Sequence, residues 1–325
     1  MTGLETKNNR VINGGIFTRT CANRKNKKHR IQRRSTEEKP MTVCIAAIAE
    51  ANTEFPKIVI AADREVTSWI SYTSGVGKIR VLTSYCWVMI STNNALMSDD
   101  IITKSLEKVN ELSKNKPDEK LTIEQIVDII SKECKRKLDI ERERFVLSPH
   151  GLSYNSYIGK SREFSREHIE ILTDDLRGFE TDNYDFTAEF LVVGIDSKPH
   201  IFTIIQNGQY VSSDIEGFAV AGGGKATAFP EITKYAYFPA LPWLTALVRV
   251  YTSKKVAERV GGVGPDTDLI VLHKMQNGGI GIWVTDEDTI KLLNKGIADI
   301  RDKEIEIWTD SLKELSTKFV PASNE

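Results

Sequence analysis

Three residues near the start of the chain have side chains that could act together in nucleophilic and acid–base chemistry: Thr42, Asp63 and Lys78. A threonine hydroxyl is a weak nucleophile near neutral pH and needs a base beside it. If Thr42 is the first residue of the chain, its own α-amine is that base, because an unperturbed α-amine has a pKa of about 7.7–8.0. We expect the Lys78 ammonium to lower the pKa of both the amine and the hydroxyl, and Asp63 to pair with Lys78 and orient it.

Each of these residues stands at the end of a predicted strand. Four apolar, β-rich runs predict strands in this part of the chain: 42–49 (TVCIAAIA), 57–62 (KIVIAA), 77–82 and 85–91. Thr42 opens the first strand, Asp63 directly follows the second, and Lys78 lies at the start of the third. Asp63, at the end of the strand that neighbours the Thr42 strand, is therefore expected to pair with Lys78.

Helical periodicity follows these strands. The predicted helices of the middle section are 95–113, 122–147 and a short one around 163–177. Thr122 and Gln125 have the spacing of a capping box, which predicts where the second helix begins. The stretch 148–183 is otherwise polar and aromatic and has no clear period.

The second half of the chain repeats the order of strands and then helices. Strands are predicted at 186–195, 200–206, 209–213, 217–221, 267–274 and 279–284. Helices are predicted at 224–235, 242–259 and 285–315. Asn207-Gly208 is a strong signal for a two-residue hairpin turn. We see no linker that divides 42–325, so we expect one domain with a C-terminal helical extension.

This order of elements predicts an α+β fold, specifically a four-layer αββα sandwich. Two antiparallel sheets packed face to face, with helix pairs on both outer faces, bury both faces of each sheet. That arrangement explains why KIVIAA and EFLVVGI are continuous apolar runs rather than alternating ones.

The segment from 42 to 115 resembles the start of a proteasome β subunit or of its bacterial and archaeal relatives. The resemblance rests on Thr42-Val43, on Ala61-Ala62-Asp63-Arg64 and on Lys78-Ile79, fifteen residues after Asp63. Residues 186–285 resemble the family more loosely. The family implies an N-terminal-nucleophile (Ntn) hydrolase fold and a threonine-type peptidase that cleaves peptide bonds within an oligomeric ring.

The resemblance also implies further site residues. The turn at Ser91-Thr92-Asn93 occupies the place of the family's oxyanion hole, so Thr92 is a candidate there. Val76 and Ile90 are candidates for lining the substrate pocket.

Two departures from the family keep other functions open. Gly222-Gly223-Gly224 stands where the family has Gly-Ser-Gly, and 261–268 does not match the family's Asp-x-x-Ser-Gly-Gly, although Asp266 or Asp268 could stand in. The alternatives are a non-catalytic structural subunit of the same fold and an Ntn amidase that acts on small amides. A phosphate-binding loop at 222–225 is disfavoured, because Ala226 replaces the Ser or Thr that such a loop needs.

Residues 1–41 are predicted to be a disordered basic extension. The first forty residues hold eleven Lys and Arg against three Glu, without apolar periodicity. The segment could be a basic arm for nucleic acid, a propeptide removed by self-cleavage, or the result of a start codon placed too far upstream. We favour the last, with translation from Met41 and removal of the methionine.

Composition narrows the remaining classes. The chain is 40% hydrophobic and 27% charged with a net charge of −1, which is typical of a globular protein. Four scattered cysteines, no apolar run of membrane-spanning length and no signal sequence predict a cytoplasmic protein. We expect neither a metal nor another cofactor, and neither membrane nor nucleic-acid partners. The expected partners are a peptide or unfolded protein substrate and further copies of the chain in a ring; an ATPase partner cannot be identified from sequence.

Overall fold

The computed structural model describes residues 42–68, 71–74, 77–116, 119–160, 163–179, 188–259 and 262–316. These residues all belong to one compact unit, Glu38–Glu325. The predicted basic extension, 1–41, and Val76 lie outside the described residues.

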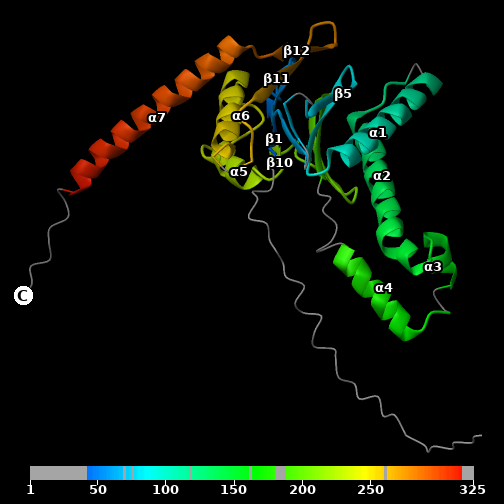
Figure 1. The fold of residues 1–325 in the computed structure, drawn as a ribbon. Coiled ribbons are helices and arrows are strands. Elements are labelled where there is room, and N and C mark those ends of the chain that lie inside the picture. Colours follow the sequence, from blue (N-terminus) through cyan, green and yellow to red (C-terminus); the bar gives the residue numbers. More distant parts are fainter. Residues whose placement is uncertain are drawn as a thin grey trace, which may run out of the picture. The chain divides into compact units, whose positions relative to one another are not determined.

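Most strands of the described chain belong to two sheets (Figure 1). Sheet 1 contains β1 (Cys44–Ala49), β2 (Lys57–Asp63), β10 (Phe218–Ala221), β11 (Thr267–Lys274) and β12 (Ile280–Val284), in the order β10-β1-β2-β11-β12. Sheet 2 contains β5 (Ile79–Thr83), β6 (Cys86–Thr92), β7 (Ala188–Ile195), β8 (Pro199–Ile205) and β9 (Tyr210–Ser212), in that order. A separate hairpin pairs β3 (Glu65–Ser68) with β4 (Ser71–Ser74). Every one of these pairings is antiparallel.

The helices of the described chain are α1 (Ala95–Asn115), α2 (Ile123–Arg142), α3 (Tyr154–Lys160), α4 (Arg166–Gly178), α5 (Lys225–Thr233), α6 (Trp243–Ala257) and α7 (Glu287–Ser316). A π-helical turn, Glu143–Leu147, and a 3-10 turn, Ser148–His150, continue α2. None of the helices in this part of the chain is long and apolar enough to cross a membrane.

The apolar core of the described chain has three large clusters and a small one, formed by Leu138, Val146 and Phe179 near the end of α2. Alternation along the strands decides which residues join which of the large clusters. One cluster lies between the sheets and includes Cys44 and Met89. A second joins the outer face of sheet 2 to α1 and α2, and a third joins the outer face of sheet 1 to α5 and α6. Because successive side chains of a strand point to opposite faces, Val43 lies in the cluster with α5 and α6, whereas its neighbour Cys44 lies between the sheets.

The predicted fold class requires correction. The expectation was a four-layer αββα sandwich of the Ntn-hydrolase type. The described chain instead is a mixed α+β fold with two five-stranded antiparallel sheets, an additional two-stranded sheet and seven helices. Helices α3 and α4 contact the π-helical turn that continues α2, and α7 contacts α6 but is mostly exposed. Periodicity identifies an amphipathic segment, but the partner of that segment depends on contacts distant in sequence.

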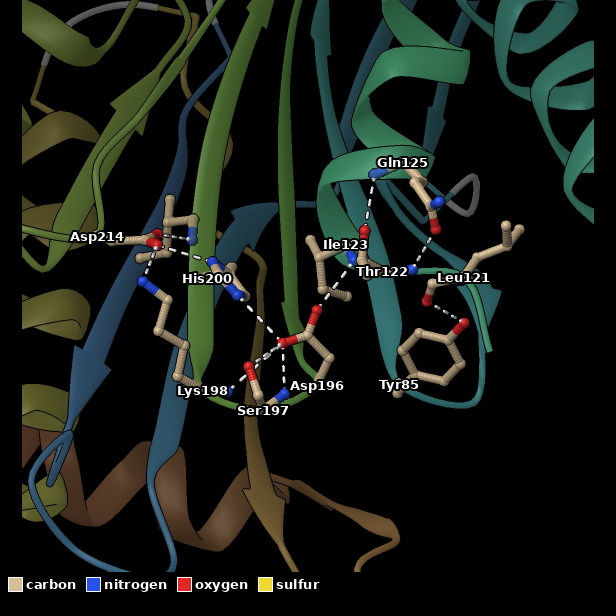
Figure 2. A network of polar contacts seen from close by, with 11 residues as sticks. Tyr85, Leu121, Thr122, Ile123, Gln125, Asp196, Ser197, Lys198, His200 and Asp214 are labelled. Atoms are coloured by element: carbon tan, nitrogen blue, oxygen red, sulfur yellow. Dashed lines mark hydrogen bonds and ion pairs between the residues drawn. The ribbon is translucent and has the colours of Figure 1, made fainter. Parts of the chain in front are cut away.

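Local predictions within this fold are confirmed. Gln125 N–H donates to Thr122 Oγ1 at 3.2 Å and Thr122 N–H donates to Gln125 Oε1 at 2.8 Å, so the predicted capping box opens α2 (Figure 2). The turn predicted at Asn207-Gly208 joins β8 to β9, with Gly208 at a φ of +82°, but as a three-residue loop, 206–208, rather than two residues, since Ile205 N–H donates to Gln209 O at 2.9 Å. Both signals are local, since each depends on residues within four positions of one another.

Candidate active site

Strand ends from both sheets bring four polar side chains to one end of the molecule. Thr42 precedes β1, Asp63 ends β2, Lys78 precedes β5, and Ser91 lies one residue before the end of β6. All four are buried, with exposed fractions of 8%, 0%, 6% and 5% in that order. Polar groups as buried as these need hydrogen-bond partners, and they find most of them in one another.

Asp63 connects the first strand to the lysine. Its Oδ1 accepts a hydrogen bond from Val43 N–H at 2.9 Å, and its Oδ2 accepts one from Lys78 Nζ at 2.7 Å. The antiparallel register of β1 and β2, in which Cys44 lies opposite Ala62, places this carboxylate beside the start of β1. The predicted pairing of Asp63 with Lys78 is therefore present, and the carboxylate links the buried cation to the backbone N–H of Val43, the residue after Thr42.

Ser91 is the member of the cluster that sequence reasoning did not select. Its Oγ lies 2.5 Å from Thr42 Oγ1, which is the distance of a short hydroxyl–hydroxyl hydrogen bond. On β6, Trp87 and Met89 face the cluster between the sheets, and Ser91 continues that alternation. The available signal was this two-residue period, which places Ser91 on the side opposite to Ile90.

The glycine-rich turn after β10 encloses Thr42. Gly222 has a φ of +97°, and a Cβ built on it would lie 2.3 Å from Thr42 O and 2.4 Å from Ser91 Oγ. Gly224 N–H donates to Thr42 O at 3.1 Å, and Gly222 N–H donates to Glu189 Oε2 at 2.6 Å. The turn therefore requires glycine at 222 both for its backbone conformation and for its close approach to Thr42.

The remaining predicted site residues do not join this cluster. Ile90 belongs to the apolar cluster with α1 and α2, so its assignment to the substrate pocket is corrected: it faces away from Thr42. Thr92 Oγ1 accepts a hydrogen bond from Asn94 N–H at 3.0 Å and donates one to Asn94 O at 3.2 Å. The Thr92 side chain thus shapes the turn into α1. Val76, the third candidate, lies outside the described residues.

A second buried lysine supports the loop next to Asp63. Lys254 is fully buried, and its Nζ donates to the carbonyl oxygens of Gly264, Pro265 and Asp266 at 2.8, 3.0 and 3.2 Å. Its ammonium also bonds to Glu258 Oε1 at 2.5 Å. Desolvation by burial lowers the pKa of Lys254, and the Glu258 carboxylate opposes that shift. Neither the sequence pattern nor the resemblance pointed to this residue.

Arg64 ties the two candidate stand-in aspartates to the end of β2. Its backbone N–H donates to Asp266 O at 3.1 Å, and its Nε donates to Asp268 Oδ1 at 2.7 Å. The Asp268 carboxylate and hydrogen bonding to it raise the pKa of Arg64. The 264–268 segment therefore braces the residue that follows Asp63, and Asp268 is engaged with a cation of its own.

The neighbouring thiol is a poor competitor for the role of nucleophile. Burial raises the pKa of Cys44 to about 12, against the opposing influence of Lys78. Because the thiolate is the reactive form of cysteine, Cys44 stays protonated and inert near neutral pH. The hydroxyls of Thr42 and Ser91 therefore remain as the candidate nucleophiles of the cluster.

A polar network at the far end of β7 is the other constellation with catalytic residue types (Figure 2). His200 Nδ1 lies 2.7 Å from Asp214 Oδ2, and His200 Nε2 lies 3.2 Å from Asp196 Oδ1. Both carboxylates also accept backbone hydrogen bonds, Asp214 from Ile201 at 2.9 Å and Asp196 from Ile123 at 3.1 Å. Since each ring nitrogen already faces a carboxylate, the imidazole has no free nitrogen to take a proton from a nucleophile. We interpret the network as structural.

A surface pocket also lies away from Thr42. It has a volume of about 580 Å³ and is formed around the start of β2 and the β11–β12 turn by residues that include Phe55, Lys57, His273 and Trp283. Asp63 is at the opposite end of β2. Among the described residues, no three His, Cys, Asp or Glu side chains gather as metal ligands would.

Comparison of the chain with protein-family models finds no match, and comparison with curated proteins finds no significant relative. The buried cluster of Thr42, Asp63, Lys78 and Ser91 therefore carries the functional argument by its own geometry.

Proposed function

We propose that the chain is a threonine-type peptidase in which Thr42, as the first residue, is the nucleophile and its own α-amine is the base. The observation that carries this proposal is the buried Asp63–Lys78 ion pair, which Asp63 links directly to the backbone N–H of Val43. A buried ammonium beside Thr42 favours a neutral amine over a second positive charge, and a neutral amine is able to accept a proton.

The proposed reaction has two steps. In the first, the Thr42 Oγ1–H proton moves to the α-amine while Oγ1 forms a bond to the substrate carbonyl carbon. The proton then passes to the leaving nitrogen as the C–N bond breaks, which leaves an ester on Oγ1. In the second, a water molecule gives a proton to the amine and attacks the ester, releasing the acid and restoring the Thr42 hydroxyl. The Lys78 ammonium stabilises the negative charge that develops near Oγ1.

The mechanism requires that no peptide bond precede Thr42 in the active form. Self-cleavage before Thr42 would meet this requirement, and so would translation from Met41 with removal of the methionine. As substrate we propose a peptide or unfolded protein, and as assembly we propose a ring of identical chains, both on the resemblance to the proteasome β subunits. We also propose a cytoplasmic location, which the buried free thiols of Cys44, Cys86 and Cys134 support.

The test begins with the mature N-terminus. The gene is kept at its native locus, the protein is purified, and its intact mass and N-terminal sequence are measured. We expect Thr42 as the first residue; an active protein whose mature chain starts elsewhere contradicts the proposal.

Activity is then measured on casein, on peptides and on small amides for the natural protein, Thr42→Ala and Thr42→Ser. Thr42→Ala should abolish cleavage, while Thr42→Ser keeps a hydroxyl and should keep much of the activity. Cleavage of small amides alone would favour an amidase, and absence of cleavage by the natural protein would favour a non-catalytic subunit. Undiminished cleavage by Thr42→Ala would contradict Thr42 as the nucleophile. A monomer in sedimentation would contradict the proposed ring.

A further inference from the structure

We propose that Ser91 is the positioning residue of Thr42: its hydroxyl donates a hydrogen bond to Thr42 Oγ1 and holds that oxygen in the direction of attack. This inference rests on the proposed function of Thr42. It adds Ser91, from β6 of sheet 2, to the three site residues that the sequence predicted: Thr42, Asp63 and Lys78.

The contact has the geometry of a built arrangement. The two hydroxyl oxygens are 2.5 Å apart, and both side chains are buried, with exposed fractions of 8% for Thr42 and 5% for Ser91. Ser91 lies on β6, which has paired strands on both sides, and its partner on β7 is Glu189. A side chain on an interior strand is held more rigidly than one on a loop, so Ser91 can define the orientation of its neighbour.

The packing beside the pair leaves no room for a side chain at position 222. Gly222 presents no Cβ to Ser91 Oγ, which a Cβ would approach to 2.4 Å. Glu189, directly across the ladder from Ser91, accepts the Gly222 N–H and so fixes the end of β10 against the two hydroxyls. Sheet 1 supplies Thr42 and Gly222, sheet 2 supplies Ser91 and Glu189, and the site forms where they meet.

The direction of the hydrogen bond follows from the proton balance. Each hydroxyl has one proton to donate and two lone pairs to accept. In the proposed first step the Thr42 proton leaves for the α-amine, so the proton shared with Ser91 must be the one that Ser91 carries. That proton stays on Ser91 throughout, and no further reactant is needed.

The contact should matter more in the transition state than before it. As Oγ1 loses its proton and gains negative charge, the hydrogen bond from Ser91 becomes charge-assisted and therefore stronger. An interaction that strengthens only along the reaction raises the rate of the chemical step and leaves substrate binding almost unchanged. A purely structural serine would instead alter folding stability without this selective effect.

The experiment uses a β-lactone, which acylates a reactive hydroxyl without requiring the natural substrate. Ser91→Ala, Ser91→Thr and Ser105→Ala are introduced at the native locus, so that each protein is made and processed as in the cell. Ser105 is the matched control: it is fully buried, but on α1, where its Oγ donates to Ile101 O at 2.7 Å. Labelling of Thr42 is followed by intact mass and peptide mapping over a range of lactone concentrations, together with the melting temperature.

We expect labelling at Thr42 in the natural protein and in Ser105→Ala. In Ser91→Ala the maximal labelling rate should fall about 10- to 100-fold, with the half-saturating concentration and melting temperature nearly unchanged. Ser91→Thr, which restores a hydroxyl, should recover most of the rate.

Three results would overturn the inference in distinguishable ways. Labelling of Ser91→Ala at the natural rate removes the role of Ser91 and leaves the proposed function standing. Absence of labelling at Thr42 in the natural protein removes the proposed function and this inference with it. A fall in Ser91→Ala matched by an equal fall in Ser105→Ala would likewise show a general loss of packing rather than positioning.

Discussion

The Asp63 carboxylate holds the Lys78 ammonium at 2.7 Å in a place where Asp63 is fully buried and Lys78 is 6% exposed. Such a pair is costly to desolvate and is retained only where the partners satisfy each other well. Here the second oxygen of Asp63 also accepts the Val43 N–H, so the pair fixes the start of β1 as well as the cation.

Asp63→Asn should therefore destabilise the protein by about 3–5 kcal/mol, because it leaves the Lys78 ammonium buried without a counter-charge. Urea denaturation at neutral pH measures this change. The control is Glu170→Gln, which breaks an exposed pair with Arg166 and should cost below about 1 kcal/mol. Equal effects of the two substitutions would contradict a buried, mutually dependent pair.

Gly222→Ala should be more damaging than the same change at another glycine with positive φ. Gly222 and Gly278 have φ values of +97° and +79°, but only at Gly222 would a Cβ meet Thr42 O and Ser91 Oγ below 2.5 Å; at Gly278 no atom lies within 4 Å. We expect Gly278→Ala to cost about 1–2 kcal/mol for backbone strain alone, and Gly222→Ala to cost more than that. Thermal and urea unfolding of both variants test the difference, and a smaller loss at 222 than at 278 would refute it.

Lys254 and Lys255 offer a matched pair, since both bond to the Glu258 carboxylate. Lys254 is fully buried and also serves three carbonyls of the 264–266 loop, whereas Lys255 is 30% exposed. Lys254→Met should lower the free energy of unfolding by several kcal/mol, about 1–3 kcal/mol for each carbonyl left buried without a donor. Lys255→Met should lower it by less than about 1 kcal/mol. Unfolding free energies decide between them, and hydrogen exchange should show the loss concentrated at 264–268. Similar losses in both variants would mean that Lys254 does not hold the loop.

The His200 network should make stability depend on pH (Figure 2). Desolvation by burial and the nearby Lys198 act to lower the pKa of His200. The hydrogen bond to Asp214 and the negative charges of Asp214 and Asp196 outweigh them, so the pKa of His200 lies above its ordinary value of 6.5. Hydrogen bonds also hold the pKa of Asp196 and Asp214 below 3.8, although burial opposes them. The stabilisation from protonated His200 is thus fully present below about pH 6.5 and is lost as the pH rises through the higher folded-state pKa.

His200→Gln should accordingly lose most stability, relative to the natural protein, at about pH 5 to 6, and the difference should shrink towards about pH 8. Below about pH 4 Asp196 and Asp214 become protonated in the natural protein and in His200→Gln alike, and the contribution of these carboxylates to stability falls. His273 should show the opposite pH dependence, because burial lowers its pKa. Its contribution to the free energy of unfolding therefore grows with rising pH, and His273→Gln should remove that growth. A pH-independent difference for His200→Gln would rule out a charged clamp.

Local chemistry made several features predictable. The strand that starts after Thr42, the strand that ends at Asp63 and the start of α2 at Thr122 all depend on residues adjacent along the chain. The Asp63–Lys78 pair was also predicted, from the resemblance and from the place of both residues at strand ends, although the β3–β4 hairpin lies between them along the chain. The four-layer class was wrong because no period in the sequence states how many strands pair or what each helix covers.

The sequence by itself identified most of the segments that become strands and helices, although not the β3–β4 hairpin or α3, and it placed Thr42, Asp63 and Lys78 at strand ends. Only the tertiary structure decided that Ser91 faces Thr42 across 49 positions while Ile90 faces the helices. Side chains alternate along a strand, so a shift of one residue exchanges the two faces, and packing between the sheets selects one of them. For the same reason the close approach at Gly222 appears only once sheet 1 and sheet 2 are placed face to face.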